Sequence, residues 1–293
     1  MIARKVRFRP LDAAIIAACL ALAGYVYYRI NFQLEYHANW GAIPQYLFRR
    51  DAATGRLVAN YLVEGLLTTL RLSFWATLLA LIVGLAVSLC RTSKSLFLRL
   101  VGGAYVETIR NLPPLVLIFI FYYFVIDQLM PLLGIDHLLA SRSAGALRVI
   151  AILFADQGLL TQFVSGVVTL AFFEGAYFAE ILRSGIESIE RGQREAAYSL
   201  GLSWADEMRF VVMPQVIRRV LPALANEFVN TIKYSSIASI VSIQELTFMG
   251  RQVVVATRAI FETWITVSLM YMTLTLTLSL LTGWLERHFQ TRS

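Results

Sequence analysis

Ionisable residues occur inside stretches of this sequence that are otherwise apolar enough to lie in lipid. A charge is costly in hydrocarbon, so such residues are candidates for binding or moving a solute. Glu174 is the clearest case, because it lies between Phe173 and Gly175 and has no basic residue within one helical turn. Its carboxylate could accept an amine of a bound solute, or it could be a protonated carboxyl that bonds to another helix.

Two further groups of polar side chains each share one face of a predicted helix, at about 100° per residue. Both faces are expected to point into a bundle, where they could line a path or could lock the helices together through hydrogen bonds and ion pairs. The face in segment 221–241 holds Asn226, Glu227, Asn230, Lys233 and Tyr234. The face in segment 62–89 holds Glu64, Thr68, Arg71 and Trp75.

The residues for common catalytic sites are missing from the sequence. Lysine occurs only at Lys5, Lys94 and Lys233, and none of them follows a glycine, so the chain has no G-x-x-x-x-G-K-[ST] loop to bind ATP. The 3 histidines are far apart and the 2 cysteines form no C-x-x-C pair. No catalytic residue, metal site or cofactor is therefore predicted for this chain.

Composition points to a membrane. The chain has 293 residues, of which 58% are hydrophobic and 15% charged, with a mean hydropathy of +0.64. Soluble domains have roughly 45–50% apolar and about 25% charged residues. The net charge of +7 comes mostly from arginines dispersed between apolar runs, which argues against nucleic-acid binding. We therefore expect an all-α polytopic protein in a lipid bilayer.

Runs long enough to cross a bilayer are predicted at six places: 11–28, 62–89, 115–133, 163–182, 221–241 and 264–285. With both termini inside, the inner segments carry about twice as many basic residues as the outer ones, as the positive-inside rule requires. The first run has an alternative interpretation as a signal peptide, with Ala21-Leu22-Ala23 as its cleavage site.

Three regions follow from these runs: 1–60 with the first span and an outer segment, 61–285 as the membrane domain, and a cytoplasmic tail at 286–293. The outer segments 31–60 and 134–160 are expected to be interfacial helices or caps.

The segment 185–219 is too charged for lipid and has orderly helix signals. A helix is predicted over 193–200 with a stop at Gly201, and Ser203 with Asp206 predicts the start of a second one. Pro214 should interrupt that second helix and Pro222 should break the chain again. Before this loop, Glu180 and Arg183 should form an ion pair. The two helices suit docking to another protein, whereas a plain solvated loop is the alternative.

The loop resembles the cytoplasmic signature of ABC-importer permeases, E-A-A-x3-G-x9-I-x-L-P. The matching residues are Glu195, Ala196, Ala197, Gly201, Val211, Met213 and Pro214, with Val and Met in place of Ile and Leu.

Other stretches resemble the branch of these permeases that transports polar amino acids such as histidine, glutamine and arginine. They are 65–70, 109–115, 176–186, 192–193, 213–228 and 233–237, so the resemblance covers about residues 60–285. Tyr234 stands where this branch usually has Asp. The extra first span is also a departure, because the common core has five spans.

The resemblance implies a type I importer fold of about six spans and a permease subunit in the bacterial cytoplasmic (inner) membrane. Two separate ABC subunits would bind ATP and dock on the ridge Glu195 to Ala197, with Gly201 as the turn and Pro214 behind it. A second permease subunit, a copy or a paralogue, and an extracytoplasmic substrate-binding protein would complete the importer. From the residues alone, an ion- or proton-coupled secondary transporter or a channel is the alternative.

Overall fold

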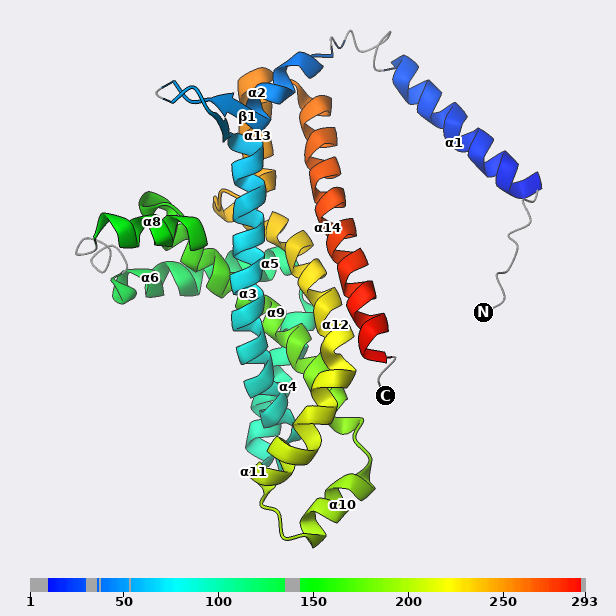
Figure 1. Cartoon of the computed structure of the whole chain (residues 1–293), viewed down its shortest axis with the longest axis vertical. Helices are drawn as coiled ribbons and strands as arrows, with labels where there is room; N and C mark the ends of the chain where they lie inside the picture. Colours follow the sequence, from blue (N-terminus) through cyan, green and yellow to red (C-terminus); the bar gives the residue numbers. More distant parts are fainter. Residues whose placement is uncertain (1–9, 30–35, 37, 53, 135–142, 291–293) are drawn as a thin grey trace.

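The computed structural model describes residues 10–29, 36, 38–52, 54–134 and 143–290. Its longest helices run side by side in a bundle (Figure 1). The α-helices are α1 (Pro10–Tyr28), α2 (Ile43–Leu47), α3 (Tyr61–Thr92), α4 (Leu96–Asn111), α5 (Pro114–Phe121), α6 (Asp127–Leu133), α8 (Ala144–Leu153), α9 (Leu160–Glu187), α10 (Arg191–Ser199), α11 (Trp204–Asp206), α12 (Met213–Tyr234), α13 (Leu246–Thr257) and α14 (Ile260–Gln290). Short 3-10 turns are η2 (Trp40–Ala42), η4 (Gln157–Leu159) and η6 (Ser235–Val241), and π-helical turns are η3 (Tyr122–Ile126) and η5 (Glu207–Val212).

Within the described residues, four helical stretches are long and apolar enough to cross a membrane. They are Tyr61–Thr92, Pro114–Leu133, Gln157–Glu187 and Ile260–Trp284. These stretches coincide with the second, third, fourth and sixth predicted runs, and α1 is a shorter apolar helix. The all-α membrane architecture is therefore confirmed.

The predicted fifth run differs from the structure. Its helix, α12, begins earlier, at Met213, and ends at Tyr234, where the 3-10 turn η6 takes over. Pro222 lies inside α12 and does not break it. Since α12 carries many polar side chains, it does not belong to the helices that are apolar enough for lipid.

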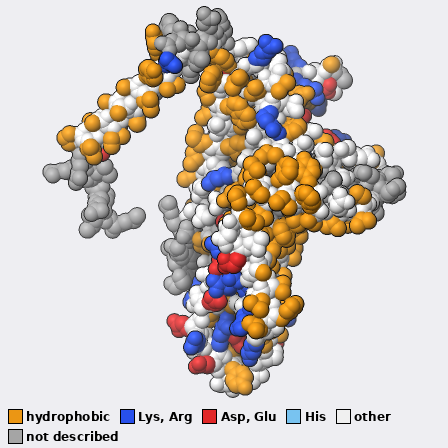
Figure 2. All heavy atoms as spheres, turned by 180° about the vertical axis from the view of Figure 1, so that it is seen from behind, with side chains coloured by type: hydrophobic (Ala, Val, Ile, Leu, Met, Phe, Trp, Pro, Cys, Tyr) orange, Lys and Arg blue, Asp and Glu red, His pale blue; other side chains and the backbone are white. Residues whose placement is uncertain are grey.

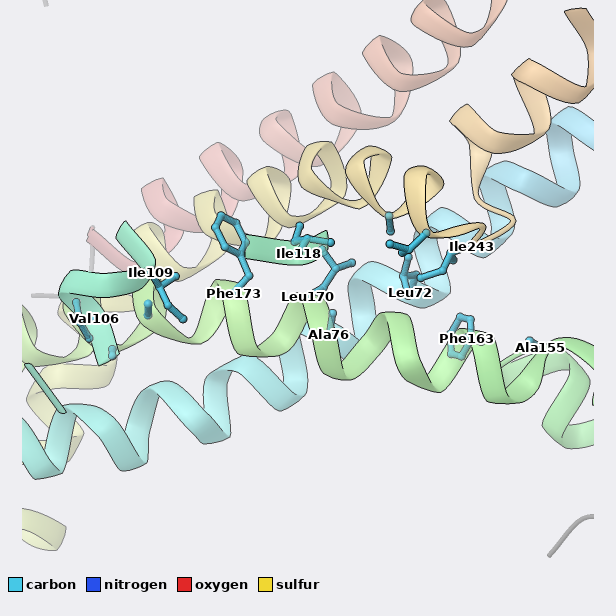
Figure 3. Packing of buried hydrophobic residues seen from close by; sticks show 14 residues of the cluster. Leu72, Ala76, Val106, Ile109, Ile118, Ala155, Phe163, Leu170, Phe173 and Ile243 are labelled. Carbon is cyan, nitrogen blue, oxygen red and sulfur yellow. The ribbon is translucent and has the colours of Figure 1, made fainter. Parts of the chain in front are cut away.

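The core lies where α3, α9 and η6 meet, with α5 closing one side. Figure 3 shows Leu72 of α3, Phe173 of α9 and Ile118 of α5 in one cluster of buried side chains. The helices approach closely at Gly84, where an added Cβ would lie 2.6 Å from the Cβ of Phe178. Small residues at helix contacts allow such close packing in membrane proteins.

One end of the bundle, the hairpin end, carries α2, α13 and a two-stranded antiparallel hairpin (Figure 1). Strands β1 (Phe48–Arg50) and β2 (Leu57–Ala59) pair with Phe48 opposite Ala59. The described part of segment 31–60 therefore contains a short helix, α2, as expected, together with a hairpin that the sequence did not predict. The side chain of Asp51 accepts a hydrogen bond from Thr54 at 2.7 Å, and Gly55 has a φ of 67°, so a turn is favoured here.

The opposite end, the loop end, carries α10 and α11 (Figure 1). Helix α14 continues to Gln290, so most of the segment expected as a tail is helical. Helix α1 continues through Ala21-Leu22-Ala23. The basic residues expected at 1–9 lie outside the described residues.

Candidate functional site

Two buried carboxylates from different helices meet in the middle of the bundle. Glu174 of α9 is 0% exposed and Glu227 of α12 is 9% exposed, and the two interact electrostatically. Neither carboxylate oxygen of Glu174 has a hydrogen-bond partner among the described residues. Glu227 accepts a hydrogen bond from the amide of Asn230 at 3.2 Å. A buried acid without a partner is costly, so this pair is suited to a ligand that brings donors or positive charge.

Aromatic rings border this acid pair. Tyr177 and Tyr234 both interact electrostatically with Glu174 and Glu227. The two tyrosine rings are stacked with centroids 6.5 Å apart, and each lies 5.3 Å from the ring of Phe173. Ring faces attract cations, so acids and rings here favour the same kind of ligand.

The structure divides the predicted path residues into two groups. Glu174, Glu227, Asn230 and Tyr234 lie together in the acid pair and its border, whereas Thr68 and Arg71 line a separate cleft at the hairpin end. Lys233 is exposed. No ion pair between the described residues joins Glu64 or Glu227 to Arg71 or Lys233. Hydrogen bonds do join α3 to α8, because Arg71 donates to Ala151 O at 3.3 Å and Trp75 donates to Leu153 O at 2.9 Å. The alternative that these side chains lock the helices together therefore stays open for α3.

The cleft at the hairpin end has a volume of about 860 Å³. The hairpin, α3, α8, the start of α9 and the segment before α13 surround it. Its arginines come from three of these elements, and its acids are distributed among them as well. The charged residues are Arg49, Arg50, Arg71 and Arg148, with Asp51, Glu64 and Asp156. Sequence reasoning selected Arg71 but missed the other three arginines, because only folding brings the hairpin and α8 to the same cleft.

A cluster of ion pairs holds α9 to α3 near the loop end. Glu180 binds Arg183 at 2.5 Å, as the spacing predicts, and it also binds Arg91 of α3. Arg110 lies 3.9 Å from the same carboxylate and 5.9 Å from the Tyr177 ring. The sequence had no local signal for Arg91 or Arg110, because each is far from Glu180 along the chain.

The loop end has the predicted helix, turn and helix. Helix α10 stops before Gly201, whose φ is 75°. The amide of Gly201 donates to Tyr198 O at 2.9 Å and that of Leu202 donates to Ala197 O at 3.2 Å, which is the Schellman ending of a helix. The next helix is capped by Ser203, whose hydroxyl accepts from the Asp206 amide at 3.2 Å.

The signature residues divide between an exposed surface and a buried contact. Glu195 and Ala196 are exposed, whereas Ala197 is buried. Near them the apolar side chains of Tyr198 and Leu200 are 80% and 81% exposed. Exposed apolar groups amid charges are typical of a surface that binds another protein.

Pro214 has a milder effect than the sequence predicts. It lies in the first turn of α12, directly after the π-helical turn Glu207–Val212. The chain thus remains helical from α11 through α12, because a widened turn and a first-turn position both tolerate proline.

In the described part of the chain, no group of three or more His, Cys, Asp or Glu could hold a metal ion.

Known proteins resemble this chain over most of its length. The model of the family "Binding-protein-dependent transport system inner membrane component" matches residues 76–293. The "Probable glutamine ABC transporter permease protein GlnM" of Bacillus subtilis is 32% identical, over 78% of this chain and 93% of that protein. The "Glutamine transport system permease protein GlnP" of Escherichia coli is 30% identical, over 88% and 99%.

A solved structure agrees with these relatives. It is a crystal structure of "an amino acid ABC transporter with histidines", with a TM-score of 0.61 and 33% identity over 78% of this chain and 94% of that chain. The family match covers the α9–α12 acid pair and the α10 loop, and the solved structure has the same fold. This chain therefore belongs to the family of binding-protein-dependent transport system inner membrane components.

Proposed function

We propose that this chain is the permease subunit of an ATP-driven importer for polar amino acids. The observation that carries the proposal is the pair Glu174 and Glu227, two buried acids that form no ion pair with any residue the structure describes, in the membrane domain of a transport family. The named relatives include glutamine permeases and a nopaline permease of Agrobacterium fabrum, so a polar amino-acid substrate fits the family.

The path follows the polar face of α12. Asn226 and Lys233 are exposed and Asn230 and Tyr234 are half-buried on this helix. Such a face is unfavourable against lipid, because each polar group would lose its hydrogen bonds with water. The polar face of α12 therefore borders a water-filled path or a second permease subunit, which is a copy or a paralogue of this chain. The path lies between the two permease subunits.

The acid pair receives the positive group of the substrate. Both carboxylate oxygens of Glu174 lack a hydrogen-bond donor among the residues that the structure describes, and the neighbouring rings of Tyr177 and Tyr234 stabilise a cation through their faces. The group held there is the α-amine or a charged side chain of the amino acid.

Coupling to ATP takes place at the loop end. The exposed ridge of Glu195 and Ala196, ended by the turn at Gly201, seats in a groove of a separate ATPase subunit, which binds and hydrolyses ATP. Ala197 is buried on the inner side of α10 and, with Pro214 at the start of α12, it transmits the movement of the ridge to the bundle. In this proposal the loop end and both termini lie in the cytoplasm, and the hairpin end lies outside, where the substrate-binding protein docks.

Uptake by vesicles that contain the permease, its ATPase and its binding protein tests the acid pair. Glu174→Gln keeps the shape and removes the charge, so we expect at least a ~10-fold lower uptake of the amino acid, since one lost charged hydrogen bond is worth about 1.5–3 kcal/mol. Glu107→Gln is the control, because Glu107 is an exposed residue of α4 whose carboxylate accepts a hydrogen bond from Asn111 of the same helix.

Two results would contradict the proposal. Unchanged affinity and uptake with Glu174→Gln would remove the acid pair from the substrate site. Uptake driven by a proton gradient without ATP would instead indicate a secondary transporter.

A further inference from the structure

Helix α1 lies outside residues 76–293, the part that the family model matches. Its 19 residues correspond to about 28 Å at about 1.5 Å per residue, close to the thickness of a bilayer core. Figure 2 shows hydrophobic side chains along the whole of this helix, and Leu11, Leu20 and Leu22 are more than 60% exposed. In Figure 1 it stands away from the bundle.

Tyr36 and Asn39, which follow α1 along the chain, are tied to the start of α14. The hydroxyl of Tyr36 donates to Glu262 Oε2 at 2.5 Å, and the amide of Asn39 donates to Glu262 Oε1. The ring of Tyr36 also meets that of Phe261 edge-on at 4.9 Å. These contacts bury Glu262, which is 1% exposed. The end of α1 at Tyr28 is eight residues before this anchor, a reach of at most roughly 28 Å.

The anchor covers the first turn of a longer helical face. Positions three and four residues apart lie on the same side of a helix, and four exposed apolar side chains continue from Glu262 in this way, with Thr266 and Thr273 at the edge of the same side. The four apolar side chains are Ile265 (45% exposed), Leu269 (50%), Met272 (50%) and Leu276 (55%). The opposite side of α14 is packed, since Thr263 and Val267 are buried. The face is therefore an open continuation of a contact that already exists at its hairpin end.

Helix α1 has a complementary face. Small residues recur on it at the same spacing of three and four, and small residues let a neighbouring helix approach closely. They are Ala14, Ala17, Ala21 and Gly24. If α1 runs towards the hairpin end and α14 runs away from it, each small residue comes to the level of one large residue of α14. The levels are Gly24 with Ile265, Ala21 with Leu269, Ala17 with Met272, and Ala14 with Leu276.

We propose that α1 packs in the bilayer as an antiparallel neighbour of α14 in the same chain, along the face that begins at Glu262. A bilayer restricts an apolar helix of this length to a direction near its normal, and the Tyr36 anchor holds it beside α14. The occupant of this face is thus a segment that the matched family region does not contain, and α14 is not a lipid-facing helix along it.

Disulfide trapping in the full-length chain, in membranes, tests this contact. A disulfide forms only when the two Cα atoms come within about 7 Å. In a background with Cys19→Ser and Cys90→Ser, the pair Ala21→Cys with Leu269→Cys should cross-link within one chain. The native Cys19 is the matched control, because it lies two residues away on the other side of α1. Cys19 with Leu269→Cys, in a Cys90→Ser background, should not cross-link.

A second variant links the cross-link to the anchor. Tyr36→Phe removes the hydroxyl that binds Glu262 and should reduce the yield of the Ala21–Leu269 cross-link. Three outcomes would overturn the proposal. Equal cross-linking of both pairs would mean that α1 has no fixed face, a cross-linked dimer alone would place α1 on a second copy, and no cross-link would leave α14 facing lipid.

Discussion

Glu245 is a buried carboxyl that should make stability depend on pH. It lies in the segment before α13 at the hairpin end and is 0% exposed. Its Oε1 accepts the amide of Phe248 at 2.8 Å, and its Oε2 accepts the hydroxyl of Tyr271 of α14 at 2.5 Å. Burial raises the pKa of Glu245 from 4.5 to about 7, although the hydrogen bond from Tyr271 acts in the opposite direction.

The sign and size of the effect follow from this shift. The folded state holds the proton of Glu245 more tightly than the unfolded state does, so the free energy of unfolding falls as the pH rises from about 4.5 to about 7. One pKa unit corresponds to about 1.4 kcal/mol, so the whole loss is about 3 kcal/mol. Between pH 5 and pH 8 it amounts to roughly 2–3 kcal/mol, or a fall in Tm of roughly 5 °C.

The comparison with Glu245→Gln isolates this contribution. A glutamine keeps one oxygen for the Phe248 amide and offers an NH₂ to the Tyr271 hydroxyl, but it does not titrate. We expect the Tm of the purified wild type, measured from pH 5 to pH 8, to fall relative to that of Glu245→Gln. Glu107→Gln should follow the wild type. Parallel profiles of the wild type and Glu245→Gln would refute the reasoning.

Gly84→Ala should lower Tm, since its Cβ would meet the α9 backbone as well as Phe178 and overpacking costs about 1–3 kcal/mol. Gly103→Ala is the control and should leave Tm unchanged or raise it, because nothing lies within 4 Å of the added Cβ. An equal fall in Tm for both variants would contradict this reasoning. Glu195→Arg should leave the amount of permease in the membrane unchanged but abolish ATP-driven uptake, and undiminished uptake in vesicles would count against the docking ridge. Gly201→Asp should do the same, because the left-handed backbone at φ 75° costs a side chain about 1–2 kcal/mol.

The sequence determines much of this protein by local rules. Apolar runs predict the spans of α3, α9 and α14, because a bilayer core is crossed by a helix of about 20 predominantly apolar residues. The helix stop at Gly201 and the cap at Ser203 also follow from neighbouring residues alone, and the structure has both. The isolation of Glu174 from basic residues is likewise visible in the sequence, since it concerns one helical turn.

Only the tertiary structure decides which distant residues meet. Glu174 and Glu227 come together because α9 packs on α12, and Arg71 joins Arg148 in one cleft because α8 folds back beside α3. The same holds for Arg91 and Glu180, and for Tyr36 and Glu262. Periodicity specifies which face of a helix is polar, but not which helix it faces. The partner depends on close packing at points such as Gly84, where the absence of a side chain lets two backbones approach, and no local pattern encodes that contact.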